Sequence, residues 1–281
     1  MISQSIKEII KRALEEDIKT GDITTEAIIL EYQTASGEFL IKQNGILAGF
    51  EIVEACFKEF DNSISFIRYY SDGDKVLSGT IAAVVEGNAK SVLTVERIAL
   101  NFFQRMSGIA TSVHQFNEKI KHTKAKLIDT RKTAPGLREI DKLAVKLGGA
   151  ENHRIGLYDM FLIKDNHIEV AGSISKAVDA CKKWRDEKKP ELKIEVETKN
   201  LDEVSAAINC GIDIIMLDNF NIDLMKEAVR LINGKCKVEA SGMVNLDSVK
   251  AIAETGVDYI SAGALTHSVK ALDISLNVKI K

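Results

Sequence analysis

The second half of the chain repeats one pattern, in which a short apolar run is followed by a segment with helical periodicity. Two linkers carry the same punctuation: Asn209–Asp213 and Glu254–Asp258 each indicate a helix closed by glycine, then a short turn into the next strand. Strands that alternate with helices are typical of βα units and a parallel sheet. The apolar runs are Leu127–Ile128, Met160–Ile163, Leu192–Val196, Ile214–Leu217, Val238–Ala240 and Tyr259–Ile260.

The number of these runs constrains the fold further. A closed (β/α) barrel of the common type has about eight strands. Because only six runs qualify as strands, the sequence predicts an incomplete or irregular barrel instead of a full one. The helices expected to accompany them are Gly136–Leu147, Ile174–Lys188, Leu201–Ile208, Ile222–Leu231 and Leu246–Glu254.

The first hundred residues predict a different arrangement, a mixed sheet built from the short strands Glu38–Ile41, Ser63–Tyr69 and Ile81–Glu86. A long helix from about Thr94 to Ile120, bent at Ser107-Gly108, is expected to join the two parts. The tail Asp273–Ile280 alternates with period two and predicts a strand that pairs with the N-terminal sheet. We therefore expect one domain at 1–110, with 271–281 packed back on it, and a catalytic domain at 111–270.

Composition and charge exclude several classes of function. The chain has 281 residues and a formal net charge of −3, whereas nucleic-acid binders usually carry a basic balance or face. No run approaches the length of a membrane span, and the amino terminus is an amphipathic helix without the apolar core of a signal peptide. The four cysteines are scattered, which indicates buried thiols in a reducing compartment. We expect a cytoplasmic protein that binds neither nucleic acid nor membrane.

Basic and polar residues follow two of the predicted strands directly. Asp129–Lys132 comes after the first strand, Lys164–His167 after the second, and His153 and Arg154 lie between them. In α/β folds, ligands bind at the carboxyl ends of parallel strands. Several cations and histidines gathered at that edge predict a small ligand with several negative charges.

The later strands end in other residue types. Glu195, Glu197 and Asp218 are carboxylates, whereas Ser241-Gly242 and Ala262-Gly263 are small residues that expose backbone N–H groups suited to a phosphate. This combination suits a phosphorylated sugar with Mg²⁺ beside a second, anionic substrate. For Glu195 and Glu197 two interpretations stay open: a structural salt bridge with Lys164, or binding of a metal or ribose.

Long motifs resemble one family, quinolinate phosphoribosyltransferase, also called nicotinate-nucleotide diphosphorylase (carboxylating). The resemblance covers essentially the whole chain, in order. Its motifs are Gly21–Thr25, Glu96–Thr111, Asp129–Arg138, Gly148–Arg154, Lys164–His167, Ile194–Thr198, Met216–Asn219, Glu239–Gly242 and Ala262–Ser268.

The resemblance implies a fold, a reaction and an assembly. The fold class is α/β, with an α+β sandwich domain followed by an open, incomplete α/β barrel. The reaction joins quinolinate to phosphoribosyl pyrophosphate with Mg²⁺, and yields nicotinate mononucleotide, pyrophosphate and CO₂ in NAD biosynthesis. The active unit is a homodimer with a shared active site, and further assembly to a hexamer stays open.

The resemblance also assigns roles to residues. Arg97 would come from the neighbouring subunit, and the 5′-phosphate would lie against Ser241, Gly242 and Met243 and against Ala262, Gly263 and Ala264. Glu197 and Asp218 would lie by the ribose and the metal, either directly or through water, and with Lys132 and Lys164 they are the expected catalytic residues. The residues expected to bind quinolinate are Thr130, Arg131, Lys132, His153, Arg154 and Lys164.

Two alternatives remain at this stage. One is a related phosphoribosyltransferase that acts on another aromatic acid, or a molybdenum-associated homologue. Nicotinate, with a single carboxylate, would not need four basic groups. The other is a catalytically silent barrel that binds a phosphorylated metabolite, against which the acidic pair Glu197 and Asp218 argues.

Overall fold

A computed structural model describes residues 2–281, which divide into two units. Unit 1 comprises residues 2–114, Ala134–Gly149 and Ser268–Lys281, and unit 2 comprises Gln115–Thr133 and Ala150–His267. Within residues 2–281, no helix combines the length and the apolarity that spanning a bilayer requires.

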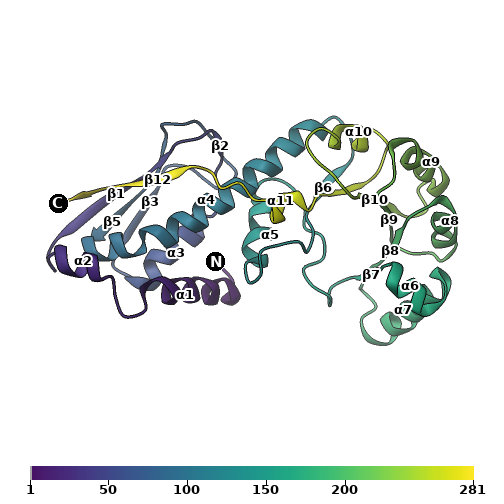
Figure 1. Cartoon of the computed structure of the whole chain (residues 1–281), viewed down its shortest axis with the longest axis horizontal. Helices are drawn as coiled ribbons and strands as arrows, with labels where there is room; N and C mark the ends of the chain where they lie inside the picture. The colour runs from purple at the N-terminus through teal and green to yellow at the C-terminus, as the bar shows by residue number, and fades with distance from the viewer. Residues whose placement is uncertain (1) are drawn as a thin grey trace. The chain divides into compact units, whose positions relative to one another are not determined.

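Unit 1 contains an antiparallel sheet in the order β12-β1-β5-β3. The tail strand β12 pairs with β1 from Ala35↔Ile280 to Ile41↔Ile274, and the two ends of the colour scale lie side by side in Figure 1. The alternation of the tail predicted this pairing. The strands are β1 (Thr34–Ile41), β3 (Ser65–Arg68), β5 (Ile81–Asn88) and β12 (Ile274–Ile280), and β2 (Gly45–Ile46) pairs separately with β4 (Lys75–Val76).

Aromatic side chains join this sheet to its helices. Phe39 of β1 makes edge contacts with Phe57 of α3 and Phe103 of α4, at ring-centroid distances of 6.3 and 5.8 Å. All three side chains are fully buried, so they form the centre of the core of unit 1. The helices that contribute to this unit are α1 (Gln4–Ile18), α2 (Ile23–Ile28), α3 (Phe50–Phe60), α4 (Ala89–Ile120) and α5 (Arg138–Leu147).

Helix α4 continues as one helix through Gly108, where a Cβ would lie 3.0 Å from Ala271 Cα, so this glycine permits close packing of the tail. One detail of unit 1 differs from expectation. Helix α5 belongs to unit 1 instead of the barrel. The buried carboxylate of Asp141 accepts two hydrogen bonds from Arg105 of α4, at 2.7 and 2.8 Å, which explains that attachment.

Unit 2 contains a six-stranded parallel sheet in the order β6-β11-β10-β9-β8-β7. Within the described residues β6 and β7 are not paired with each other, so the barrel is open, as predicted. Its strands are β6 (Lys126–Ile128), β7 (Phe161–Ile163), β8 (Ile194–Thr198), β9 (Ile214–Asp218), β10 (Lys237–Ser241) and β11 (Tyr259–Ser261).

Helices cover the outer side of this curved sheet (Figure 1). Most follow the predicted bounds closely, because each has an apolar face and an Asn or Ser N-cap. Helix α6 was not predicted; it begins at Asp165, directly after Lys164. The helices are α6 (Asp165–Ala171), α7 (Ile174–Lys188), α8 (Leu201–Asn209), α9 (Ile222–Ile232), α10 (Val249–Ala253) and α11 (Ala264–His267).

Candidate active site

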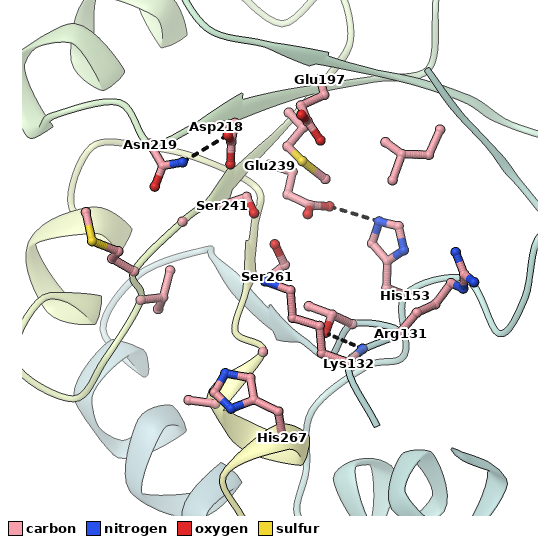
Figure 2. A pocket seen from close by; sticks show the side chains of 18 of the residues that line it. Arg131, Lys132, His153, Glu197, Asp218, Asn219, Glu239, Ser241, Ser261 and His267 are labelled. Atoms are coloured by element: carbon pink, nitrogen blue, oxygen red, sulfur yellow. Dashed lines mark hydrogen bonds and ion pairs between the residues drawn. The ribbon is translucent and has the colours of Figure 1, made fainter. Parts of the chain in front are cut away.

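A cavity of about 810 Å³ opens at the carboxyl ends of the strands of unit 2. Its size suits a small-molecule site. Figure 2 shows Glu197 and Asp218 at one side of this pocket and Arg131 and Lys132 at another. The predicted site residues that line it are Thr130, Arg131, Lys132, His153, Arg154, Lys164, Glu197, Asp218, Ser241, Gly242, Met243, Gly263 and Ala264.

The loop that follows β6 supplies the first cations. The Lys132 backbone N–H donates to Thr130 Oγ1 at 3.0 Å, and the Lys132 carbonyl accepts from Thr266 Oγ1 at 2.8 Å. These bonds fix the loop beside the cavity. Arg131 Nε is buried, and no hydrogen-bond acceptor for it is present within residues 2–281. A buried guanidinium N–H without an acceptor is costly, so this position favours an incoming anion.

Arg154 adds a second guanidinium to the same wall. Its Nη1 donates to the Met160 carbonyl at 3.1 Å, which directs the side chain. Burial lowers the pKa of Arg154, and the nearby charge of Arg131 lowers it further. Two like charges held this close are stabilised by a shared anion, and a planar carboxylate is the natural partner of a guanidinium.

The acidic sector lies on β8 and β9. Lys164 Nζ donates to Glu197 Oε2 at 2.9 Å, so the salt bridge left open from the sequence forms with Glu197 and not with Glu195. Asp218 Oδ2 accepts from Asn219 Nδ2 at 2.9 Å (Figure 2). Both carboxylates line the cavity, and carboxylate oxygens are the protein ligands that Mg²⁺ prefers, so this donor set fits that ion.

A buried cluster of three groups lies in the cavity wall. His153 Nε2 is 2.9 Å from Glu195 Oε2 and 3.4 Å from Glu239 Oε2, and Figure 2 shows His153 and Glu239 facing each other. Neither carboxylate is exposed. Glu239 lines the cavity but was not predicted; its signal was a carboxylate between the apolar residues Val238 and Ala240.

Small residues form the third sector, after β10. Gly242 has a φ of 101°, Met243 of 47° and Asn219 of 57°, so three cavity residues hold left-handed backbone. The Asn219 N–H donates to the Ser241 carbonyl at 2.9 Å, which holds the ends of β9 and β10 together. Asn219 also lines the cavity. The sequence did not predict it as a site residue, because its hydrogen-bond partners, Asp218 and Ser241, lie on two different strands.

Substituting Gly242 with Ala should disrupt this sector. A Cβ at that position would lie 2.6 Å from Asn219 Cγ and 3.0 Å from Asn219 N, in a backbone conformation that favours glycine. We expect Asn219 to be displaced from Asp218 and the site to lose activity by about tenfold or more, with about 1–3 kcal/mol less stability. Gly234→Ala is the matched control, because it shares a positive φ but has open space around its Cβ. Equal effects of the two substitutions on activity would contradict the assignment.

Two predicted residues do not line the cavity. Ala262 is buried, and its N–H already donates to the Ile128 carbonyl at 3.1 Å, so this amide is engaged in the sheet. Arg97 lies on α4 in unit 1, where it is exposed. Conversely, His267, which was not among the predicted site residues, lines the cavity.

Comparisons with known proteins agree with these features. The quinolinate phosphoribosyl transferase N-terminal domain matches residues 22–107, and the C-terminal domain of the same family matches residues 109–277. A quinolinate phosphoribosyltransferase [decarboxylating] of Nicotiana tabacum is 45% identical, over 97% of this chain and 82% of the relative. A probable nicotinate-nucleotide pyrophosphorylase [carboxylating] of Bacillus subtilis is 42% identical, over 98% and 94%.

Solved structures agree as well. NadC from Streptococcus pyogenes superposes with a TM-score of 0.95 at 36% identity, covering 100% of this chain and 99% of that one. Nicotinate-nucleotide pyrophosphorylase from Francisella tularensis gives a TM-score of 0.92 at 40% identity, covering 99% and 98%. The two domain matches span nearly the whole chain, and we conclude that it belongs to the quinolinate phosphoribosyl transferase family.

Proposed function

We propose that this protein transfers the phosphoribosyl group of phosphoribosyl pyrophosphate to quinolinate, forming nicotinate mononucleotide, pyrophosphate and CO₂ in NAD biosynthesis. One observation carries the proposal: a single cavity combines two adjacent guanidinium groups, a pair of carboxylates and a glycine loop. The names of the relatives support the same reaction.

The cationic wall would bind and orient quinolinate. This substrate is a planar dianion, and the ring nitrogen must face C1 of the ribose for bond formation. Arg131 and Arg154 offer bidentate contacts to its carboxylates, and Lys132 adds a third positive charge to the same cavity. Holding both reactants in one geometry removes much of the entropic barrier of a bimolecular step.

The acidic sector would stabilise the ribose as pyrophosphate leaves. The C–O bond at C1 breaks ahead of attack, so positive charge develops on the sugar, and the carboxylates of Glu197 and Asp218 face that charge. When bound, Mg²⁺ would neutralise the leaving pyrophosphate, with Glu197 and Asp218 as its protein ligands. Lys164 Nζ contacts Glu197 in this structure. When Glu197 binds Mg²⁺, Lys164 would contact a substrate oxygen instead.

Decarboxylation needs no protein nucleophile. Once the ring nitrogen carries the ribose, the pyridinium stabilises the electron pair of the C–CO₂ bond as CO₂ leaves, and the ring carbon then takes up a proton from water to give nicotinate mononucleotide. Lys132 and Lys164 are the catalytic cations expected to balance charge through these steps. The loops at 241–243 and 263–264 would hold the 5′-phosphate through backbone N–H groups.

Incubating the protein with phosphoribosyl pyrophosphate, Mg²⁺ and quinolinate labelled at the 2-carboxylate tests the reaction. We expect labelled CO₂, pyrophosphate and nicotinate mononucleotide in equal amounts. Nucleotide formed from nicotinate without CO₂ would favour a nicotinate-using enzyme. Tight phosphate binding without any product would favour a barrel that only senses a metabolite, and conversion of another aromatic acid would favour a related transferase or a molybdenum-associated homologue.

We also propose that the active unit is a homodimer in which Arg97 completes the site of the neighbouring subunit, with the hexamer as a further stage of assembly. The exposure of Arg97 on α4 supports this, because an exposed arginine is available to a second copy. Mixing inactive Arg97→Ala and Lys132→Ala proteins should restore up to about a quarter of wild-type activity, since one intact site forms per heterodimer. No recovery in a mixture that exchanges subunits would contradict shared sites.

The compartment proposed for this reaction is the cytoplasm. The four cysteines are free thiols, which suits a reducing environment. The names of some plant relatives include the word mitochondrial or the word chloroplastic. Imaging a tagged full-length protein in its host would test the assignment.

A further inference from the structure

His153 is held from three sides by carboxylates. Its backbone N–H donates to Asp129 Oδ1 at 2.9 Å, and Nε2 faces Glu195 Oε2 at 2.9 Å and Glu239 Oε2 at 3.4 Å. Asp129, directly after β6, therefore holds the backbone of His153, and the ring itself is fixed by Glu195 of β8 and Glu239 of β10. Its side chain is 8% exposed and lines the cavity.

The two glutamates have few other partners. Glu195 and Glu239 are both fully buried, and Glu195 Oε1 and both carboxylate oxygens of Glu239 accept no hydrogen bond from any of residues 2–281, so Glu239 meets His153 as an ion pair. Burial and the neighbouring charge of Glu239 raise the pKa of Glu195, but the pair still leaves at least one negative charge facing the ring nitrogen, which stabilises the protonated ring. Burial by itself lowers the pKa of His153, but the hydrogen bond with Glu195 and the ion pair with Glu239 outweigh burial and raise the pKa to about 10.

We propose that Glu195 and Glu239 are positioning residues that keep the His153 ring cationic and fixed in orientation, so that it binds one carboxylate of quinolinate. This inference rests on the proposed function and deepens it. The cavity would then present a third fixed cation beside Arg131 and Arg154, independent of pH over the physiological range. Neither glutamate needs to touch the substrate.

A preorganised cation is useful because the substrate carries two carboxylates. An unperturbed histidine has a pKa near 6.5 and is mostly neutral at neutral pH, so it could not serve as a constant cation. A bound metal ion is a competing interpretation of the cluster, since the three ligand atoms lie within 4.8 Å of one another. Metal ligation needs a neutral imidazole, whereas these carboxylates favour the protonated one.

Glu195 and Glu239 favour protonation of this ring, and the positive charges of Arg131 and Arg154, which line the same cavity, would oppose it. The remaining charged or titratable residues of the cavity lining are Lys132, Lys164, Glu197, Asp218 and His267.

Steady-state kinetics of the double variant Glu195→Gln/Glu239→Gln from pH 6 to pH 8.5 test the proposal. Without either carboxylate, burial is left to lower the pKa of His153, and the ring should lose its proton as pH rises through neutrality. We expect KM for quinolinate to rise about tenfold or more between pH 6 and pH 8, with a smaller change in kcat and in KM for phosphoribosyl pyrophosphate. The wild type should show no such rise.

Controls separate this role from a structural one. Each single variant should shift KM in the same direction by less than the double variant does, and Glu187→Gln, on the exposed face of α7, should match the wild type. A double variant whose KM for quinolinate follows the wild-type pH profile would overturn the proposal. Stoichiometric metal in the wild type that the double variant loses would also overturn it.

A second measurement covers the case in which the variant does not fold. NMR of the wild type, with the His153 imidazole signal assigned through His153→Asn, should show a protonated ring up to about pH 9. A ring that titrates near pH 6.5 would refute the inference even if the wild type converts quinolinate. Absence of any labelled CO₂ from the wild type would instead refute the proposed reaction.

Discussion

Replacing Asp218 with Asn should lower kcat by about 10²- to 10³-fold, the size of effect seen when one transition-state-stabilising group is removed. The substitution keeps the shape of the side chain and its place beside Asn219, but removes the negative charge that we propose acts on the ribose and the metal. Because that charge acts mainly as positive charge develops at C1, KM for quinolinate should change little. Initial rates of CO₂ release at saturating substrates measure the loss.

A matched substitution shows whether the position matters. Asp223→Asn removes a carboxylate in the same unit, but its side chain is 97% exposed on α9 and lies outside the cavity lining. We expect wild-type kcat from this control. Full activity of Asp218→Asn would remove Asp218 from the mechanism, and an equal loss in both variants would point to a general effect on folding.

Arg154→Ala and Arg131→Ala should each weaken quinolinate binding by about 30-fold or more, equivalent to about 2–5 kcal/mol. Each variant leaves a buried substrate carboxylate without its guanidinium partner. Removing Arg131 also removes a buried Nε that has no acceptor among residues 2–281. The substitution should therefore lower the affinity for quinolinate and leave the free energy of unfolding almost unchanged. Calorimetric titration with quinolinate measures the affinity.

Arg230, which is exposed on α9, provides a control for the loss of one positive charge from the protein. Arg230→Ala should bind quinolinate like the wild type, and thermal unfolding of all three variants should stay close to that of the parent. Unchanged affinity in either Arg131→Ala or Arg154→Ala would withdraw that arginine from the site.

Local patterns predicted most of the barrel. Buried parallel strands are apolar on both faces, so Ile214–Leu217 and its neighbours stood out between amphipathic helices. Helix α7 begins and ends at the predicted residues because Ser173 caps it and its periodicity is regular. These strand assignments located the carboxyl ends of the strands. They therefore predicted that the cationic residues, the carboxylates and the glycines would lie together in one cavity.

The remaining features of the fold and of the site depend on contacts between residues that are far apart in the sequence. Nothing in the sequence near 138–147 shows that α5 joins unit 1, because that depends on the ion pair between Asp141 and Arg105. The partner of Lys164 could not be chosen between Glu195 and Glu197, since both share one face of β8 and only the packing of His153 separates them. Glu239 and Asn219 were missed for the same reason.

The central claim is that this cavity binds a dianion through paired guanidinium groups. Titrating the wild type with quinolinate and with nicotinate under the same conditions tests it most directly, because the two ligands differ by one carboxylate. We predict that quinolinate binds about 30-fold or more tightly, and that Arg154→Ala removes most of this difference. Equal affinities of the wild type for the two acids would contradict the account.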